Sequence, residues 1–219
     1  MTDTNLYDIK SEHYYTCERE EMLAFVPAEA KTILDIGCGD GSFAETLKAR
    51  NKAEVWGVEL MQSSGEKAIP KLDKVMIGEV EKYIHELPDN YFDVITCNDV
   101  LEHLFEAEDL LVQLKSKLKS GGVLVSSIPN VRYLNNLIHI LFEKDFRYEE
   151  EGIRDQTHVR FYTQKSIAAM FERTGYKVVK SVGINPTKSL RYYIYKILMP
   201  FIFTADTKYV QIATVAVKV

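Results

Sequence analysis

Cysteine, tryptophan and long apolar runs are scarce in this sequence. Its 219 residues contain 3 Cys and 1 Trp. Cys17, Cys38 and Cys97 are odd in number and widely spaced, so they fit neither a disulfide framework nor a zinc cluster and favour reduced thiols in a cytosolic protein. No run reaches the roughly 18 apolar residues that a membrane-spanning helix needs. The polar N-terminal residues also lack the apolar stretch of a secretory signal. We therefore expect a cytoplasmic protein without a transmembrane segment.

Positive charge is also in deficit. Lys and Arg number 27 against 32 Asp and Glu, which gives a net charge of -5. Proteins dedicated to duplex nucleic acid are usually basic, because phosphate contacts supply much of their affinity, so the balance argues against nucleic acid as a partner. Hydrophobic residues make up 46% of the chain, which is ordinary for a globular protein and excludes a disordered one. The length fits a single domain over residues 1–219.

Short β-rich runs alternate with longer helical stretches over the first two thirds of the sequence. This alternation predicts a parallel sheet with helices on both faces. In the final third, two β-rich runs joined by a modest connection predict an antiparallel pair at the sheet edge. Earlier in the sequence, Gly121 and Gly122 are expected to end the helix predicted over residues 107–118. Predicted strands cover residues 31–36, 54–60, 74–77, 91–97, 123–128, 176–184 and 209–218, and predicted helices cover 42–50, 79–86, 107–118, 130–142 and 163–174.

A glycine-rich segment after the first predicted strand is the most informative part of the sequence. Residues 34–42 read LDIGCGDGS, with glycines at alternate positions. Glycine lets the backbone turn sharply and approach a ligand without a Cβ clash. The GxGxG spacing differs from the GxGxxG of dinucleotide sites, in which helix N–H groups face a pyrophosphate. The carboxylate of Asp35, at the strand end, instead suits a ligand that carries a cationic amine.

Acidic residues follow the next two predicted strands. Glu59 ends the second strand, where a carboxylate can accept both hydroxyls of a ribose. Glu79 follows the third strand, at the place where an adenine ring would end. The alternative for Glu79 is an ordinary charge at a helix N-terminus.

Together these segments resemble the class I S-adenosylmethionine-dependent methyltransferases. The resemblance rests on LDIGCGDG, WGVEL, IGEVE, FDVITCNDVLEHL and LKSGGVLVSSIPN, in that order. It implies an α/β, Rossmann-like, seven-stranded and mostly parallel sheet with one antiparallel strand, helices on both faces and a helical insertion over the active site. It implies S-adenosylmethionine as the cofactor, with Glu59 at the ribose and Glu79 with Val80 at the adenine. The full set of implied cofactor residues is Asp35, Gly37, Cys38, Gly39, Glu59, Leu60, Glu79, Val80 and Asn98.

A second polar group follows the fourth predicted strand. On a helical turn, Asp99, Glu102 and His103 would share one side, and such side chains suit a divalent ion such as Mg²⁺, Mn²⁺ or Fe²⁺. Glu102, His103 and the later His158 resemble the metal-bearing motif of the small-RNA 3′-terminal 2′-O-methyltransferases. The O-methyltransferases of ubiquinone biosynthesis carry a similar Glu-His motif. Asp99 replaces the first Glu of the motif with a shorter side chain.

The same residues have alternative roles without a metal. His103 and His158 are then the catalytic candidates, as general bases that manage the proton of the acceptor. His103 could also simply contact the cofactor or cap a helix.

The sequence constrains the methyl acceptor less than the cofactor. Residues 129–132 and 155–163 resemble methyltransferases found with bacterial surface-polysaccharide synthesis, which implies a sugar or glycan hydroxyl. Arg132, Arg154 and Arg160 could grip a phosphate or a nucleotide-linked sugar, or form ordinary salt bridges. The alternatives are a small acceptor of the quinone or catechol type and a cofactor-binding scaffold without catalysis.

Aromatic residues gather in the segments expected to cover the acceptor. These segments are an N-terminal helical cap at 1–29 and insertions at 130–162 and 186–207. Tyr and Phe faces pack against sugars or flat rings, but they can equally form the core of a lid or a dimer surface, which leaves a homodimer open. Lys188, Arg191 and Lys196 also permit the last insertion to dock peripherally on a membrane surface.

Overall fold

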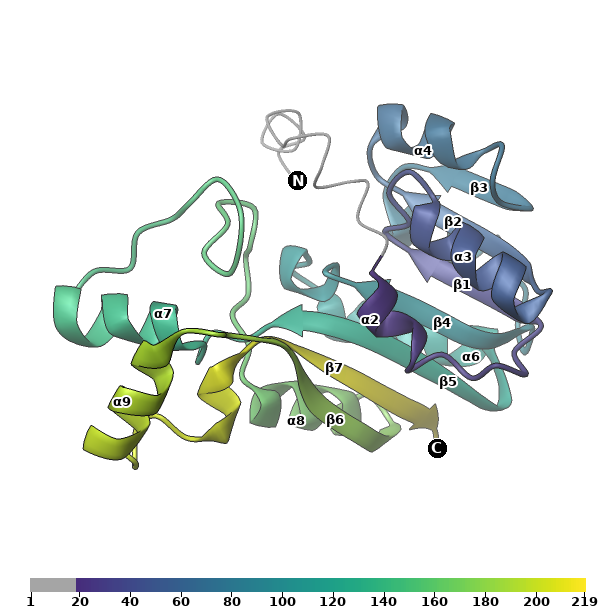
Figure 1. Cartoon of the computed structure of the whole chain (residues 1–219). Helices are drawn as coiled ribbons and strands as arrows, with labels where there is room; N and C mark the ends of the chain where they lie inside the picture. The colour runs from purple at the N-terminus through teal and green to yellow at the C-terminus, as the bar shows by residue number, and fades with distance from the viewer. Residues whose placement is uncertain (1–18) are drawn as a thin grey trace.

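The computed structural model describes residues 19–219 and centres on one sheet. In this part of the chain, seven strands pair in the order β3-β2-β1-β4-β5-β7-β6 (Figure 1). Strands β1 to β5 pair in parallel, whereas β7 runs antiparallel to both β5 and β6. This arrangement confirms the predicted sheet and its antiparallel pair at the edge. The strands are β1 (Thr32–Ile36), β2 (Glu54–Glu59), β3 (Lys74–Ile77), β4 (Phe92–Asn98), β5 (Leu118–Pro129), β6 (Tyr176–Pro186) and β7 (Tyr209–Lys218).

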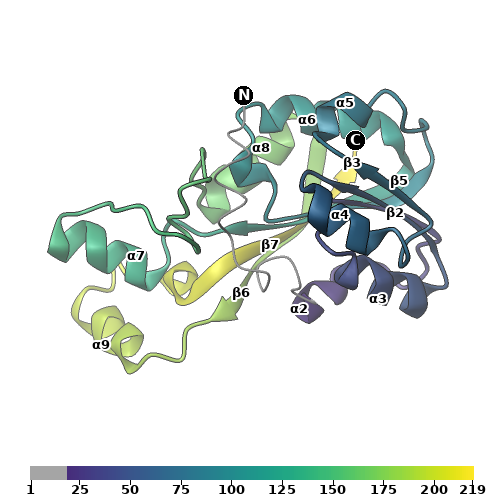
Figure 2. The same ribbon diagram turned by 90° about the horizontal axis from the view of Figure 1, so that it is seen from above.

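Helices cover both faces of the sheet, because successive strand residues point to opposite sides. Ile33 and Val94 pack with helices α2, α3 and α4 on one face, and Leu34 and Ile95 pack with α5, α6 and α8 on the other. Figure 2 shows these two helical layers on either side of the strands. The helices are α2 (Glu20–Leu23), α3 (Ser42–Asn51), α4 (Gln62–Ala68), α5 (Val80–Tyr83), α6 (Ala107–Lys117) and α8 (Gln164–Arg173).

Some element boundaries differ from those expected. Helix α4 was not predicted, and the helix predicted over 79–86 is only the single turn α5. Gly121 and Gly122 do not end α6: the helix stops at Lys117 and β5 begins directly at Leu118. The two glycines lie in the irregular start of this strand, within the register shift of the pairing with β4 between Leu118 and Val123.

A smaller cluster lies beyond the strand ends where β5 and β6 finish and β7 begins (Figures 1 and 2). Here α7 (Leu134–Ile138), a π-helix (His139–Glu143) and α9 (Leu190–Leu198) enclose Leu134, Tyr192 and Phe203. We call residues 134–143 and 190–203 the α7–α9 module. The helix predicted over 130–142 therefore begins only at Leu134.

Arg132 fastens the α7–α9 module to the end of β5. Its Nε donates to Oδ2 of Asp206 (2.6 Å) and its Nη2 donates to the carbonyl of Ile202 (3.1 Å). Asn130, in the same turn, donates from Nδ2 to the carbonyls of Asp206 (2.9 Å) and Tyr209 (3.1 Å). The module is thus tied to the carboxyl end of β5 and to the chain that enters β7.

Two expectations concern the chain outside the sheet. Of the N-terminal cap predicted over 1–29, residues 1–18 lie outside the described residues, and α2 lies within the remainder. Within residues 19–219, no helix combines the length and the apolar character needed to cross a membrane.

Candidate functional site

A cavity of about 530 Å³ lies at the carboxyl ends of β1, β2, β3 and β4. Crevices of this kind are where open α/β sheets bind ligands. The structure brings every predicted cofactor residue to its wall: Asp35, Gly37, Cys38, Gly39, Glu59, Leu60, Glu79, Val80 and Asn98. The cavity also reaches His103 and the neighbouring Leu104 and Phe105.

The glycine loop at the start of the cavity is pressed against β2 and the turn after β4. The N–H groups of Gly37 and Cys38 donate to the carbonyl of Val58 (2.8 and 3.1 Å). Gly37 has a positive φ of 72°, and a Cβ there would lie 2.5 Å from Cγ2 of Val100. Both the conformation and the close contact therefore require glycine at this position.

Glu59 is a buried carboxylate fixed by backbone donors. Its Oε2 accepts a hydrogen bond from the N–H of Gly39 (2.8 Å), and its Oε1 accepts one from the N–H of Met61 (2.8 Å). Burial raises the pKa of Glu59, and these backbone hydrogen bonds oppose that rise. Each carboxylate oxygen keeps further lone pairs, which can accept the hydroxyls of a ribose in the cavity.

Asp35 lies deeper in the same wall. Its pKa is raised to about 7, chiefly by burial. The hydrogen bond from Oγ1 of Thr96 (2.5 Å) opposes this rise, and the charge of Glu59 adds to it. A cationic group beside Asp35 would favour its charged form. The site therefore suits a ligand that brings a positive charge.

Asn98 supplies a further polar group to the cavity. Neither its Nδ2 nor its Oδ1 has a hydrogen-bond partner among the described residues, although both atoms are buried. Buried amides are normally paired in folded proteins. A polar ligand in the cavity would satisfy this one.

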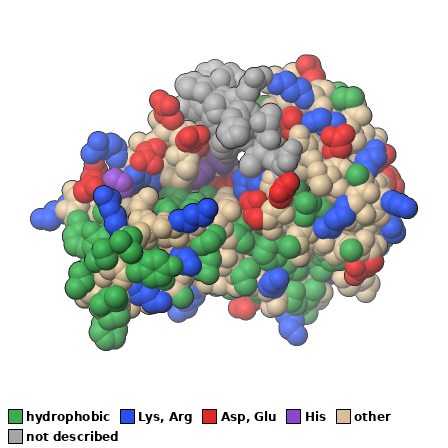
Figure 3. All heavy atoms as spheres, viewed as in Figure 1, with side chains coloured by type: hydrophobic (Ala, Val, Ile, Leu, Met, Phe, Trp, Pro, Cys, Tyr) green, Lys and Arg blue, Asp and Glu red, His purple; other side chains and the backbone are tan. Residues whose placement is uncertain are grey.

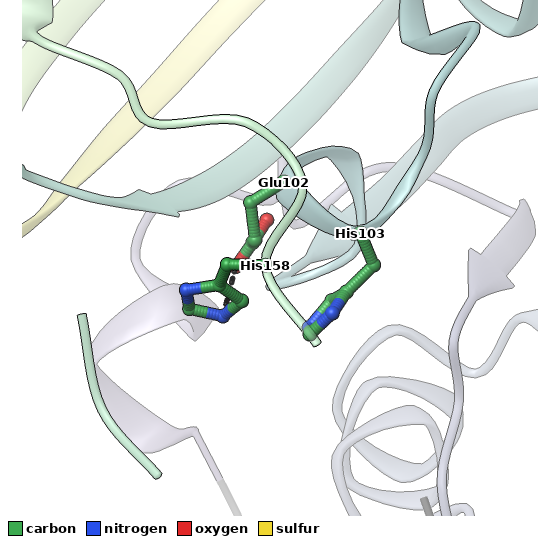
Figure 4. A group of neighbouring side chains, drawn as sticks. All are labelled: Glu102, His103 and His158. Carbon is green, nitrogen blue, oxygen red and sulfur yellow. Dashed lines mark ion pairs between the residues drawn. The ribbon is translucent and has the colours of Figure 1, made fainter. Parts of the chain in front are cut away.

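Glu102, His103 and His158 form a buried group next to the cavity (Figure 4). Glu102 and His103 lie on a short 3-10 helix, and His158 comes from the loop before α8. The N–H groups of Val159 and Arg160 donate to the carbonyl of Glu102 (3.0 and 3.1 Å), which fastens that loop to the helix. One potential ligand atom from each of the three side chains lies within 4.8 Å of the others.

The hydrogen bonds of the two histidines define their ring orientation. Nδ1 of His103 lies 3.1 Å from the carbonyl of Thr157, and Nδ1 of His158 lies 3.0 Å from the carbonyl of Ile153. Because a carbonyl oxygen can only accept, Nδ1 is the protonated nitrogen and Nε2 the basic one in each neutral ring. Nε2 of His158 lies 4.0 Å from Oε1 of Glu102, the pair dashed in Figure 4. This geometry suits either a metal ligand set or a general base.

Asp99 does not join this group. It has a positive φ of 52° and precedes the 3-10 helix, which begins only at Leu101, so the helical spacing expected for it does not apply. Its Oδ1 accepts from Nε2 of Gln211 (2.5 Å), and its Oδ2 pairs with Arg19. This placement corrects the expected ligand set by removing Asp99 from it.

The sequence reasoning missed two supports of the site. Asp155 accepts hydrogen bonds from the N–H (2.8 Å) and Oγ1 (2.7 Å) of Thr157, the residue that contacts Nδ1 of His103. The segment DQTH around His158 carried this signal. Arg19 also lines the cavity, but it comes from a distant part of the chain and no local motif indicates it.

The arginines expected to grip a phosphate are engaged within the protein. Arg132 clamps the α7–α9 module. Arg154 is buried and pairs with Glu149. Arg160 donates from Nε to the carbonyl of Phe105 (3.0 Å). These contacts agree with the salt-bridge alternative for Arg132 and Arg154, and Arg160 fixes a backbone segment of the cavity wall.

An aromatic cluster stands beside His158. The ring of Phe161 lies 6.4 Å from that of His158, and Phe146 (5.0 Å) and Tyr148 (6.2 Å) pack on Phe161. Phe146 and Tyr148 remain exposed on their other sides. The side of the molecule that carries His158 thus offers flat apolar faces next to an imidazole.

Comparison with known proteins identifies the family. A family model described as a methyltransferase domain matches residues 8–181. The mitochondrial ubiquinone biosynthesis O-methyltransferase of Schizosaccharomyces pombe is 41% identical over 169 residues, which cover 72% of this chain and 60% of that protein. The ubiquinone biosynthesis O-methyltransferase of Pseudoalteromonas translucida is 29% identical over 163 residues, which cover 71% of this chain and 67% of that protein. The chain therefore spans only about two thirds of the length of these relatives.

Solved structures share the fold. A SAM-dependent methyltransferase from Archaeoglobus fulgidus matches with a TM-score of 0.72 and 21% identity, over 99% of this chain and 97% of that chain. At this identity the likeness bears on the fold alone. With the family match over most of the sequence and the cavity at the expected strand ends, the chain belongs to the class I S-adenosylmethionine-dependent methyltransferases.

Proposed function

We propose that this enzyme transfers the methyl group of S-adenosylmethionine to a hydroxyl of a small planar acceptor of the catechol or quinol type. The observation that carries the proposal is the buried Glu102–His103–His158 group, which the cofactor cavity reaches at His103. The cofactor would lie along the glycine loop, Glu59 and Asn98. The acceptor would lie between the cofactor and the histidines.

The transfer needs one proton acceptor near the hydroxyl. The hydroxyl oxygen attacks the methyl carbon of the sulfonium, the new C–O bond forms, and the C–S bond breaks with its electrons going to sulfur. S-adenosylhomocysteine leaves as a neutral thioether. His103, whose basic nitrogen is Nε2, takes the hydroxyl proton, and the nearby Glu102 carboxylate favours the positive charge that results.

The same three side chains fit a divalent ion. Two imidazoles and one carboxylate with ligand atoms within 4.8 Å of one another are a donor set typical of Fe²⁺, whereas Mg²⁺ prefers oxygen ligands. A bound ion would orient two adjacent hydroxyls and lower their pKa. Adjacent hydroxyls are what a catechol offers.

A planar acceptor fits the surroundings better than the sugar or glycan hydroxyl that the sequence favoured. Phe146, Tyr148 and Phe161 present aromatic faces beside His158, which suits a flat ring. The arginines that a nucleotide-linked sugar would need are occupied by protein groups. The two relatives named above are ubiquinone biosynthesis O-methyltransferases, and neither is named for a sugar.

The proposal is tested by an acceptor panel with labelled S-adenosylmethionine. We expect methylation of 3,4-dihydroxybenzoate, a soluble catechol, and none of uridine diphosphate N-acetylglucosamine. Methylation of the sugar nucleotide alone would contradict the proposal and support a sugar or glycan hydroxyl as the acceptor. Tight binding of S-adenosylhomocysteine with no acceptor methylated would instead support a non-catalytic scaffold.

The metal is tested separately by chelation. Loss of catechol methylation in EDTA that added Fe²⁺, Mn²⁺ or Mg²⁺ restores, at unchanged affinity for S-adenosylhomocysteine, would show that the three side chains hold an ion instead of supplying a base. Full activity after chelation would exclude a required metal ion and would support His103 as the general base.

A further inference from the structure

Helix α9 carries apolar side chains on two opposite faces. The inner face packs Tyr195 between the rings of Phe142 (5.6 Å) and Phe203 (5.1 Å), with Tyr192 buried beside them. The outer face has no cover within the described part of the chain. Its exposed fractions are 72% for Leu190, 80% for Ile197, 70% for Leu198 and 96% for Phe201.

The outward residues form one continuous stripe. Residues 190, 194, 197 and 198 fall on the same side of a helix with about 3.6 residues per turn, and Phe201 extends the stripe past the helix end. Leu141 and Phe142, also exposed, lie on the neighbouring π-helix of the same module. Figure 3 shows hydrophobic side chains gathered over this end of the molecule, with Lys and Arg among them. Apolar patches of this kind mark an interaction surface.

The charge around the stripe is basic, although the chain as a whole is acidic. Between residues 186 and 205 the sequence has Lys188, Arg191 and Lys196 and no Asp or Glu, in a chain whose net charge is -5. By helical spacing, Arg191 lies along one border of the stripe. Lys196 lies nearer the inner face, with its Nζ 5.8 Å from the ring centre of Tyr192. Basic side chains at the borders of an apolar helix face are typical of helices that lie in the plane of an anionic lipid surface.

We propose that the outer face of α9 docks the enzyme on a bilayer that contains anionic phospholipids. The apolar stripe would enter the boundary between headgroups and acyl chains, and Lys188 and Arg191 would remain at the phosphates. A second copy of the chain is a poorer occupant, because a symmetric dimer would bring two basic borders together. The proposal goes beyond the proposed function and does not depend on the acceptor.

The position of the docking surface gives it a functional meaning. Arg132 fastens the α7–α9 module to the end of β5 through the carbonyl of Ile202, and Asn130 holds the carbonyl of Asp206, three residues past the module. Val131, between them, donates from its N–H to the carbonyl of Tyr162 (2.9 Å), next to the aromatic cluster at Phe161. Docking through α9 would therefore be linked, through this backbone contact, to the covering segment that carries the aromatic cluster.

Vesicle sedimentation of the full chain tests the docking surface. The probes are vesicles of phosphatidylcholine alone and of equimolar phosphatidylglycerol and phosphatidylcholine. We expect at least about tenfold tighter binding to the anionic vesicles, since each basic residue near such a surface contributes about fivefold. The double variant Ile197→Ser with Phe201→Ser should bind them at least about tenfold more weakly.

A matched variant controls for the loss of exposed apolar surface. Ile69 and Val112 are 54% and 55% exposed and lie outside the α7–α9 module, so Ile69→Ser with Val112→Ser should bind vesicles like the unaltered chain. Both double variants should keep the affinity for S-adenosylhomocysteine, which shows that they fold. Equal binding to both vesicle types, no binding to either, or equal loss in the two double variants would overturn the proposal. So would a dimer in sedimentation analysis that Phe201→Ser dissociates.

Discussion

The sheet platform of residues 30–128 and the covering segments of residues 130–162 and 186–207 are built differently. In the platform, polar side chains such as Glu59 are held by backbone N–H groups at the strand ends. In the covering segments, aromatic and aliphatic side chains such as Phe146 and Phe201 stay exposed. Local backbone geometry can form a site for a single ligand at the strand ends. Surfaces that receive an acceptor or a partner must instead keep apolar side chains exposed.

Glu102, His103 and His158 join the two regions. The first two come from the platform and the third from a covering segment, and the link is the carbonyl of Glu102 that accepts from Val159 and Arg160. Binding and chemistry should therefore be separable by substitution.

The largest effect is expected at the junction of the two regions. His103→Ala should lower kcat by about 10²- to 10⁴-fold, because it removes the proton acceptor at the end of the cavity. Steady-state kinetics with 3,4-dihydroxybenzoate measures it. The exposed His85 lies outside the site, so His85→Ala should leave kcat unchanged; a similar loss in both variants would contradict the assignment.

The next effect belongs to the platform alone. Glu59→Gln should weaken S-adenosylhomocysteine binding about 100-fold, because a buried charged acceptor is replaced by a neutral amide. Isothermal titration calorimetry measures the affinity. Glu54→Gln on the same strand is the control, since Glu54 is exposed at the other end of β2. Unchanged affinity in Glu59→Gln would show that Glu59 does not hold the cofactor.

The pH dependence of cofactor affinity sharpens the role of Asp35. Because burial raises its pKa to about 7, Asp35 is mostly protonated below that pH and gains its charge above it. A cationic cofactor prefers the charged form, so the affinity for S-adenosylmethionine should rise about tenfold from one pH unit below 7 to well above it. Titrations across this range should give a flat profile for Asp35→Asn. A flat profile in the unaltered enzyme would contradict the contact.

The smallest effect is expected in the covering segment. Phe161→Ala should raise KM for the catechol by about two- to tenfold, because one aromatic face beside the acceptor is lost. The affinity for S-adenosylhomocysteine should not change. Phe142→Ala removes an aromatic ring from the α7–α9 module instead and should leave KM for the soluble catechol as it was. An equal rise of KM in both variants would mean that Phe161 affects KM only through the packing of the covering segments.

The cavity at the strand ends could be predicted from sequence because local geometry fixes the residues that line it. Gly37 and Asp35 belong to one strand–turn–helix unit, and Glu59 ends the adjacent strand, so their positions follow from the parallel pairing of β1 and β2. The spacing alone then placed them at one edge of the sheet. The same local logic failed for Asp99, where a positive φ separates it from the helix that follows.

The remainder depends on contacts between distant segments. His158 and Thr157 reach His103 only through a loop more than fifty residues away in sequence. Helix α9 was not predicted, although residues 190, 194, 197 and 198 recur at the spacing that indicates a helix. Helix α4 was missed because its sequence, QSSGEKA, is polar and short.

The most direct test of the division between binding and chemistry is one paired measurement on Glu59→Gln and His158→Ala: Kd for S-adenosylhomocysteine and kcat with the catechol. We expect Glu59→Gln to lose affinity about 100-fold, and His158→Ala to keep its affinity within about twofold while kcat falls at least about 100-fold. Full turnover in His158→Ala, or a loss of cofactor affinity equal to that of Glu59→Gln, would contradict a catalytic centre at Glu102, His103 and His158.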